Sequence, residues 1–279
     1  MNLNNANRLV SLYSELGVTA PAALRSAIDR TIDLHAKFDN YAKPYRRGEL
    51  ADQLYAEILT CIDAGRDPAA SSKVANLHAR IQLLDENWPN RAHATATNDA
   101  LAPLNDTAIQ RDLFAALTTP VATAWEALAE AVAHLGYDYD PDSTDVLKRG
   151  SAKAAAWITA RDTQETLRVV TEAWLTIRAT DHIAAGTGAE RALLVARPAD
   201  GKDFTMMFRE YNFGNLVPRT WHEINRGDFT FYKAAQAGWV TDVATSVDDL
   251  NARLHAAHNW YEQHPVTIPQ QPHTGGLLR

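Results

Sequence analysis

Residues 151–182 have the sequence SAKAAAWITARDTQETLRVVTEAWLTIRATDH, and their apolar spacing predicts the fold class. Intervals of three, four and three residues separate the large apolar side chains Leu167, Val170, Trp174 and Ile177. This rhythm places them on one face of an α-helix, and it is typical of a helix that packs against other helices. At about 1.5 Å per residue, the helix would be roughly 45 Å long. The stretch therefore predicts one element of a helical bundle.

A change of composition near Gly186 and Gly188 divides the chain. About 185 Ala-rich residues with helical periodicity precede it, and short alternating runs rich in Gly, Pro and aromatic residues follow it. We therefore expect a mainly α protein, with a multi-helix, bundle-like N-terminal region and a small α+β C-terminal region that contains a β-hairpin. The expected domains are 1–185, with a possible sub-boundary at 90–104, and 189–264, followed by an extended Pro/Gly tail at 265–279.

Other segments of the N-terminal region also have helical periodicity. The expected helices cover residues 4–16, 21–41 and 48–64, a segment from the Asp67-Pro68 cap towards Trp88, and residues 105–135. Residues 90–103 are polar and rich in Ala and Thr, and we predict a connector there. Pro120 lacks a backbone N–H, so we expect a kink or two abutting helices at that point.

The hairpin is expected around Asp200-Gly201, because this pair lies between the apolar runs 191–197 and 204–209. Glycine adopts positive φ at little cost, which favours a tight turn between strands. Residues 229–232 and 239–243 are further strand candidates. Ser246 and Asp249 form a capping-box pattern that predicts the start of a helix.

The bulk composition restricts the classes of partner. A net charge of −7 over 279 residues disfavours a surface for nucleic acid, whose phosphates repel an acidic protein. No apolar run approaches the ~20 residues of a membrane span, so no membrane insertion is expected. No signal peptide is visible and Cys61 is the single cysteine, which together predict a cytoplasmic protein without disulfides. Only seven of the 27 basic residues are lysine, a composition typical of high-GC genomes such as those of actinobacteria and their phages.

The first candidate site is an acidic loop of four carboxylates, Asp138, Asp140, Asp142 and Asp145. Carboxylates at alternate positions of a turn can converge on Ca²⁺, the one cofactor that this sequence suggests. The glycine and glutamate of a complete EF-hand loop are missing, because Ser143 and Arg149 occupy their places. The alternative is an acidic turn whose side chains cap the following helix.

The second candidate site consists of His255, His258, Glu262 and His264, and helical spacing places the first three on one face. Imidazole and carboxylate together suit Zn²⁺ or Fe²⁺. The alternative is that these histidines pack against neighbours or contact the carbonyl groups at the helix end.

Aromatic residues of the C-terminal region are candidates for a protein interface. The expected interface residues are Trp221, Trp239, Trp260 and Tyr261. Trp and Tyr favour interfaces because one end of the ring packs while the polar end stays hydrated. Packing in the core is the alternative for each of them.

These observations favour a structural or assembly protein that acts through protein–protein contacts, such as a component of an actinobacterial phage virion. Its partners would be other protein subunits, in a homo-oligomer or as virion neighbours, and it would be found in the cytoplasm or in the virion. One alternative is a metal-dependent enzyme that uses the acidic loop or the histidine cluster. The other is a cytoplasmic adaptor or inhibitor that binds one host protein.

Overall fold

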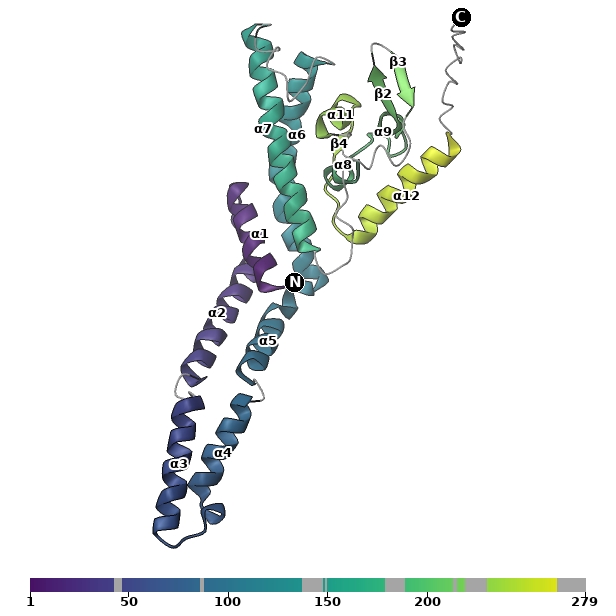
Figure 1. Cartoon of the computed structure of the whole chain (residues 1–279). Helices are drawn as coiled ribbons and strands as arrows, with labels where there is room; N and C mark the ends of the chain where they lie inside the picture. The colour runs from purple at the N-terminus through teal and green to yellow at the C-terminus, as the bar shows by residue number, and fades with distance from the viewer. Residues whose placement is uncertain are drawn as a thin grey trace, which may run out of the picture. The chain divides into compact units, whose positions relative to one another are not determined.

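The computed structural model is mainly α with a small antiparallel β-hairpin, which confirms the predicted fold class (Figure 1). It describes residues 1–42, 47–85, 88–136, 148, 150–178, 189–212, 215–218 and 230–264. Within those ranges, no helix combines the length and the apolar character needed to cross a lipid bilayer. The chain forms two compact units, one of residues 1–7 and 22–109, the other of residues 8–21 and 110–279. The predicted domain boundary at 186–188 lies outside the described residues.

The first unit consists of paired helices. Its elements are α2 (Ala22–Ala42), α3 (Arg47–Asp63), η1 (Pro68–Ala70), α4 (Ser72–Asp85), α5 (Trp88–Leu101) and η2 (Ala102–Asn105). Figure 1 shows α2 beside α5 and α3 beside α4, and these two pairs have the most extensive contacts of the unit. Between α2 and α5, the imidazole rings of His35 and His93 stack with their centroids 4.7 Å apart. His35 Nε2 also lies 2.7 Å from Thr97 Oγ1.

The predicted connector at 90–103 is wrong, because residues 88–101 form helix α5. Polarity suggested a loop, yet alanine has the highest helix propensity of all residues. The small side chains of Ala96 and Ala100 are buried, which lets α5 approach α2 closely. Tertiary packing therefore outweighs the polar character of the exposed face.

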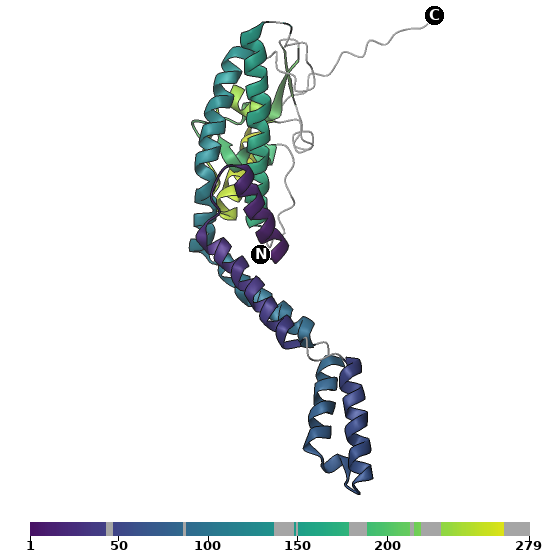
Figure 2. The ribbon, with the colours of Figure 1, turned by 90° about the vertical axis from the view of Figure 1, so that its left-hand side faces the viewer.

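The second unit is built on α7 (Ser151–Ile177), on α6 (Thr107–Leu135) from Gln110 onward, and on α1 (Leu3–Glu15) from Arg8 onward. Figure 2 shows α6 and α7 side by side. Phe114 of α6 and Trp174 of α7 are in contact, with ring centroids 5.3 Å apart. The hydroxyl of Tyr13 on α1 donates a 2.7 Å hydrogen bond to the carbonyl of Leu113. Burial raises the pKa of Tyr13, so this hydroxyl remains a hydrogen-bond donor further into the alkaline range than a free tyrosine does.

Helix α6 continues through Pro120, so the predicted alternative of two abutting helices is wrong. Proline removes one helical hydrogen bond and clashes with the preceding turn. Leu117 and Val121 on either side of it are fully buried. Both halves of α6 are therefore held by one core, and its packing compensates for the lost bond.

The remaining elements of the second unit are short. They are α8 (Ala189–Val195), β1 (Ala196–Arg197), α9 (Thr205–Phe208), β2 (Arg209–Asn212), β3 (Asn215–Pro218), α11 (Phe231–Gln236), β4 (Val240–Thr241) and α12 (Val247–Gln263). β1 pairs antiparallel with β4, and β2 with β3. Ser246 caps α12 as predicted, because its side chain accepts a hydrogen bond from Asp249 N.

The hairpin predicted around Asp200-Gly201 is wrong, because the flanking runs are largely helical. Residues 192–196 are all buried, and a run that is apolar on every side fits a buried helix as well as a buried strand. The observed hairpin pairs Arg209–Asn212 with Asn215–Pro218. The strand predicted at 229–232 is also wrong, since Thr230 caps helix α11, which starts at Phe231.

Two indole groups attach the chain segment 239–244 to the long helices. Trp125 Nε1 on α6 donates to the carbonyl of Trp239 at 3.1 Å. Trp174 Nε1 on α7 donates to the carbonyl of Ala244 at 2.6 Å. Both indoles are buried, so each bond also satisfies two polar groups that water cannot reach.

Arg253 connects α12 to this segment and to α8. Its side chain is 9% exposed, and the guanidinium group contacts both carboxylate oxygens of Asp249 at 3.0 Å. It also donates to the carbonyls of Leu193 and Asp242, and lies 3.3 Å from the Asp242 carboxylate. Asp242 in turn pairs with Arg197 on β1. One side chain thus fixes α8, the β1–β4 pair and α12 together.

Replacement of Arg253 by methionine should destabilise the second unit by about 3 kcal/mol. That is the lower end of the cost of breaking a buried ion pair, because Asp242 and Asp249 are each about a third exposed and can be rehydrated. Urea unfolding followed by tryptophan fluorescence measures this, since six of the seven tryptophans belong to the second unit. Arg161→Met is the control, because its side chain is 57% exposed and contacts the neighbouring Asp162 and the ring of Trp157 on the same helix, so about 1 kcal/mol or less is expected. Equal losses in both variants would contradict the role of Arg253.

Candidate functional site

Part of the predicted site set lies outside the described residues. This applies to the acidic loop of Asp138, Asp140, Asp142 and Asp145, and to Trp221. The calcium site and the interface role of Trp221 therefore stay predictions.

The structure places the predicted histidine cluster on α12. His258 Nε2 lies 3.2 Å from Glu262 Oε1, and both side chains are about half exposed or more. Among the residues that the structure describes, no group of three or more His, Cys, Asp and Glu side chains is arranged to hold a metal ion. His258 and Glu262 form a surface contact that is an ion pair when the imidazole is protonated.

The three remaining interface candidates differ in burial. Trp239 is 4% exposed, and its ring packs edge-on against Phe204 with centroids 6.1 Å apart. Trp260 and Tyr261 are only partly buried, and both rings pack on Phe208, at 5.4 Å and 4.8 Å. Trp239 thus belongs to the core, whereas Trp260 and Tyr261 lie at the surface of an aromatic cluster.

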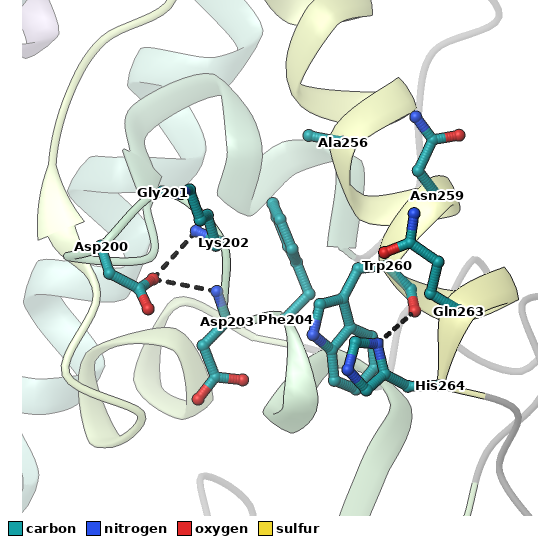
Figure 3. A pocket seen from close by; sticks show the side chains of 10 residues that line it. All are labelled: Asp200, Gly201, Lys202, Asp203, Phe204, Ala256, Asn259, Trp260, Gln263 and His264. Atoms are coloured by element: carbon teal, nitrogen blue, oxygen red, sulfur yellow. Dashed lines mark hydrogen bonds between the residues drawn. The ribbon is translucent and has the colours of Figure 1, made fainter.

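Trp260 also forms one wall of an open groove with a volume of about 460 Å³ (Figure 3). The groove lies between the loop before α9 and the C-terminal half of α12. Its lining residues are Asp200, Gly201, Lys202, Asp203, Phe204, Ala256, Asn259, Trp260, Gln263 and His264. Those on α12 recur at helical spacing, so the groove runs along one face of that helix.

The loop wall is shaped by aspartate turns. Asp200 Oδ1 accepts hydrogen bonds from the backbone N–H groups of Lys202 and Asp203, both at 2.9 Å. Gly201 adopts a φ of +68°, which other residues rarely adopt. Asp203 Oδ1 accepts from the backbone N–H of Thr205, the first residue of α9. These turns hold two carboxylates and one ammonium group beside the groove.

The backbone donors stabilise the ionised form of Asp200. The N–H of Lys202 and then that of Asp203 lower the pKa of the Asp200 carboxyl group, although this side chain is fully exposed. The carboxylate therefore keeps its negative charge to a lower pH than a free aspartate does.

The helix wall is made of stacked rings. The indole of Trp260 and the imidazole of His264 are nearly parallel, at 12°, with centroids 4.6 Å apart. His264 Nδ1 lies 2.9 Å from the carbonyl of Trp260. A carbonyl only accepts hydrogen bonds, so Nδ1 carries a proton and Nε2 is the acceptor nitrogen of the neutral ring. Figure 3 shows the two rings together on the α12 side of the groove.

The chemistry of this lining suits binding. It offers aromatic faces, the amide groups of Asn259 and Gln263, and carboxylates. Aromatic faces and amides bind extended peptide, and carboxylates bind cationic side chains.

The sequence pointed to one wall of the groove and missed the other. Trp260 was predicted as an interface residue and His264 as a member of the histidine cluster, but Asp203 and Phe204 were not singled out for a site. The predicted hairpin placed a β-turn where this wall lies. The i, i+4 spacing of Ala256, Trp260 and His264 was the available signal for a common face.

Comparisons with known proteins found no matching family model, no similar curated protein and no similar solved structure.

The lowered pKa of Asp200 can be tested by carboxyl NMR titration of the full-length protein. Its midpoint should lie below the ordinary aspartate value of about 3.9. A depressed folded-state pKa contributes stability that is present above about pH 4 and is lost as the pH falls through the folded value.

Two variants identify the cause of that shift. Lys202→Ala keeps both backbone donors, so the midpoint should stay low. Gly201→Ala strains the turn at positive φ, so the midpoint should rise towards the ordinary value. An ordinary midpoint in the unmodified protein would rule out the turn as described.

Proposed function

We propose that this chain is a structural or assembly protein that acts through protein–protein contacts, and that its groove binds an extended, cationic segment of another protein subunit. The arginine-rich composition favours a virion component of an actinobacterial phage as the setting. The observation that carries the proposal is the groove itself, with stacked aromatic rings on one wall and two carboxylates on the other.

The aromatic wall supports binding of an extended backbone. Prolyl and aliphatic side chains pack on flat aromatic faces, and an extended peptide loses little conformational entropy when it is already stiff. The amide groups of Asn259 and Gln263 line the same groove and can pair with backbone N–H and C=O groups. These features select an extended shape without requiring a particular sequence.

The loop wall supports a preference for positive charge. Asp200 and Asp203 outnumber Lys202, and the turn keeps Asp200 ionised. A Lys or Arg side chain of the segment can therefore form charge-assisted hydrogen bonds there. The net charge of −7 adds a long-range attraction for a cationic partner.

The groove is also attached to a stable part of the unit. α12 is fixed at its start by the Ser246 cap and by the contacts of Arg253. Phe208, which is fully buried, supports Trp260 and Tyr261 from beneath. A preformed groove binds with a smaller ordering cost than a mobile one.

Selection from a displayed random heptapeptide library on the immobilised full-length protein tests this function. Peptides that combine Pro or aliphatic residues with Lys or Arg should be enriched, and an enriched peptide should shift the indole resonance of Trp260 in an NMR titration. Enrichment of acidic peptides, or no enriched pattern, would contradict the proposal.

Asp200→Asn is the matched variant for charge. The amide oxygen of asparagine can still accept both backbone hydrogen bonds, so the turn is kept while the negative charge is removed. The preference for Lys and Arg should weaken by several-fold, whereas the preference for Pro and aliphatic residues should remain. If enrichment is unchanged in this variant, the cationic side chain does not bind at the loop wall.

A further inference from the structure

An apolar stripe lies exposed on α3, in the first unit and apart from the groove. Tyr55, Leu59 and Ile62 are 67%, 60% and 56% exposed. Their spacing of four and three residues places them on one face of the helix. Other large apolar residues of the described chain with comparable exposure are single ones on separate elements, such as Ile32 on α2 and Ile158 on α7. Clustered exposure of this kind marks an interaction surface.

The stripe is not the face by which α3 packs on α4. That face carries the buried residues Leu50 and Cys61, and Glu57 pairs with Lys73 of α4 at 2.6 Å. At about 100° per residue, Leu50 and Cys61 lie on roughly the opposite side of the helix from Tyr55 and Leu59. α3 therefore has two apolar faces, and α4 accounts for one of them.

We infer that a second copy of this chain docks on the stripe, with its α3 antiparallel to the first. The order of side-chain sizes along the stripe carries the inference. Gly48 and Ala51 continue the same face towards the N-terminus, Tyr55 lies at the centre, and Leu59 and Ile62 lie towards the C-terminus. Two antiparallel copies centred on Tyr55 place Ile62 opposite Gly48 and Leu59 opposite Ala51.

This pairing is self-complementary, as a two-fold interface must be. Each large side chain meets a small residue of the other copy. At Gly48, a Cβ atom would have no neighbour within 4 Å, so the room for Ile62 of the second copy is available. A parallel pair would instead bring large side chains together at one end and small residues together at the other.

The size of the stripe sets the strength of the contact. α3 has 17 residues and is about 25 Å long. One helix face of that length buries less than the roughly 800 Å² per partner of a standard stable interface. The dimer is therefore weak and driven by concentration. The two α3–α4 pairs together supply four helices, as in a small bundle.

The charges beside the stripe give a second, independent test of the antiparallel arrangement. Asp52 and Asp63 are exposed and lie on the same side of the stripe. In an antiparallel two-fold pair, each flank of one helix lies beside the same flank of the other helix. The flank with Asp52 and Asp63 on one copy is therefore next to the corresponding flank of the second copy. Salt screens this repulsion, and association should strengthen as the ionic strength rises.

Sedimentation equilibrium of the full-length protein over a concentration series tests the inference. A monomer–dimer equilibrium is expected, with tighter association in 0.5 M than in 0.05 M NaCl. Association that weakens with salt would indicate a parallel pair or a different surface, and would overturn the antiparallel arrangement. A monomer at every concentration, including millimolar, would overturn the dimer.

The chain offers a closely matched pair of variants. Ile62→Ser lies on the stripe and Ile32→Ser lies outside it, while their side chains are 56% and 57% exposed. The first should raise the dissociation constant about tenfold, since both copies lose a buried aliphatic side chain, and the second should leave it unchanged. Equal effects of the two variants would overturn the assignment to α3. Peptide selection on the groove has an independent outcome, so failure of one proposal leaves the other standing.

The variant Tyr55→Cys measures the register directly. The antiparallel register brings this position close to its equivalent in the second copy, so a short bis-maleimide should link two copies. Thr60→Cys is exposed but lies away from the stripe, and it should link far less. Equal linking at both positions would overturn the register.

Discussion

The arrangement of the short C-terminal elements depends on one buried guanidinium group. Arg253 is nine-tenths buried, and burial of an unpaired cation would be prohibitive. Two carboxylates and two backbone carbonyls surround it, so its charge and its donors are satisfied only when α8, Asp242 directly after β4, and α12 are all in place. An apolar side chain could fill the same space, but it would not require three segments to adopt one particular arrangement. We regard Arg253 as a group that specifies the fold of this region.

This constraint reaches the groove through α12. Trp260 lies two turns beyond Arg253 on the same helix, so fixing Arg253 sets the position of the aromatic wall. The loop wall is fixed separately, by the turns of Asp200 and Asp203 and by the contact of Phe204 with Trp239. Trp239 is held by the indole of Trp125 on α6. The two walls are therefore tied to one core through different contacts.

The sequence predicted the long helices well because each has a buried apolar stripe at helical spacing. The prediction from sequence failed for a short segment whose side chains are buried on every side. The run 192–196 is apolar at every position, so neither the helical period nor the strand period is visible in it. It also failed at 90–103, where the buried side is made of alanine, which contributes little to a hydrophobic pattern.

The same limits explain which part of the groove could be predicted. Trp260 and Tyr261 were recognisable because large aromatic residues near a helix end favour interfaces. Asp203 and Phe204 obtain their role from a turn and from a contact with Trp239, 35 positions away, and local periodicity contains neither. Conversely, the apolar residues of α3 predicted a helix, but their pattern did not separate an exposed face with Tyr55, Leu59 and Ile62 from a second face with Leu50 and Leu54. Only the position of α4 distinguishes the buried face from the exposed one.

The two proposed contacts differ in symmetry, and this difference determines what they can build. An antiparallel α3 pair uses the same surface on both copies, so it closes after two copies and cannot extend a chain of subunits. A groove that binds a segment of another subunit is heterologous and leaves both copies of the dimer with a free groove. Two weak grooves in such a dimer would bind a partner with repeated segments more tightly than either groove alone wherever both are engaged at once, because the second binding event is intramolecular. On these two proposals together, the dimer would engage an assembled, multivalent partner in preference to its free subunits, which is the behaviour that the proposed assembly role requires.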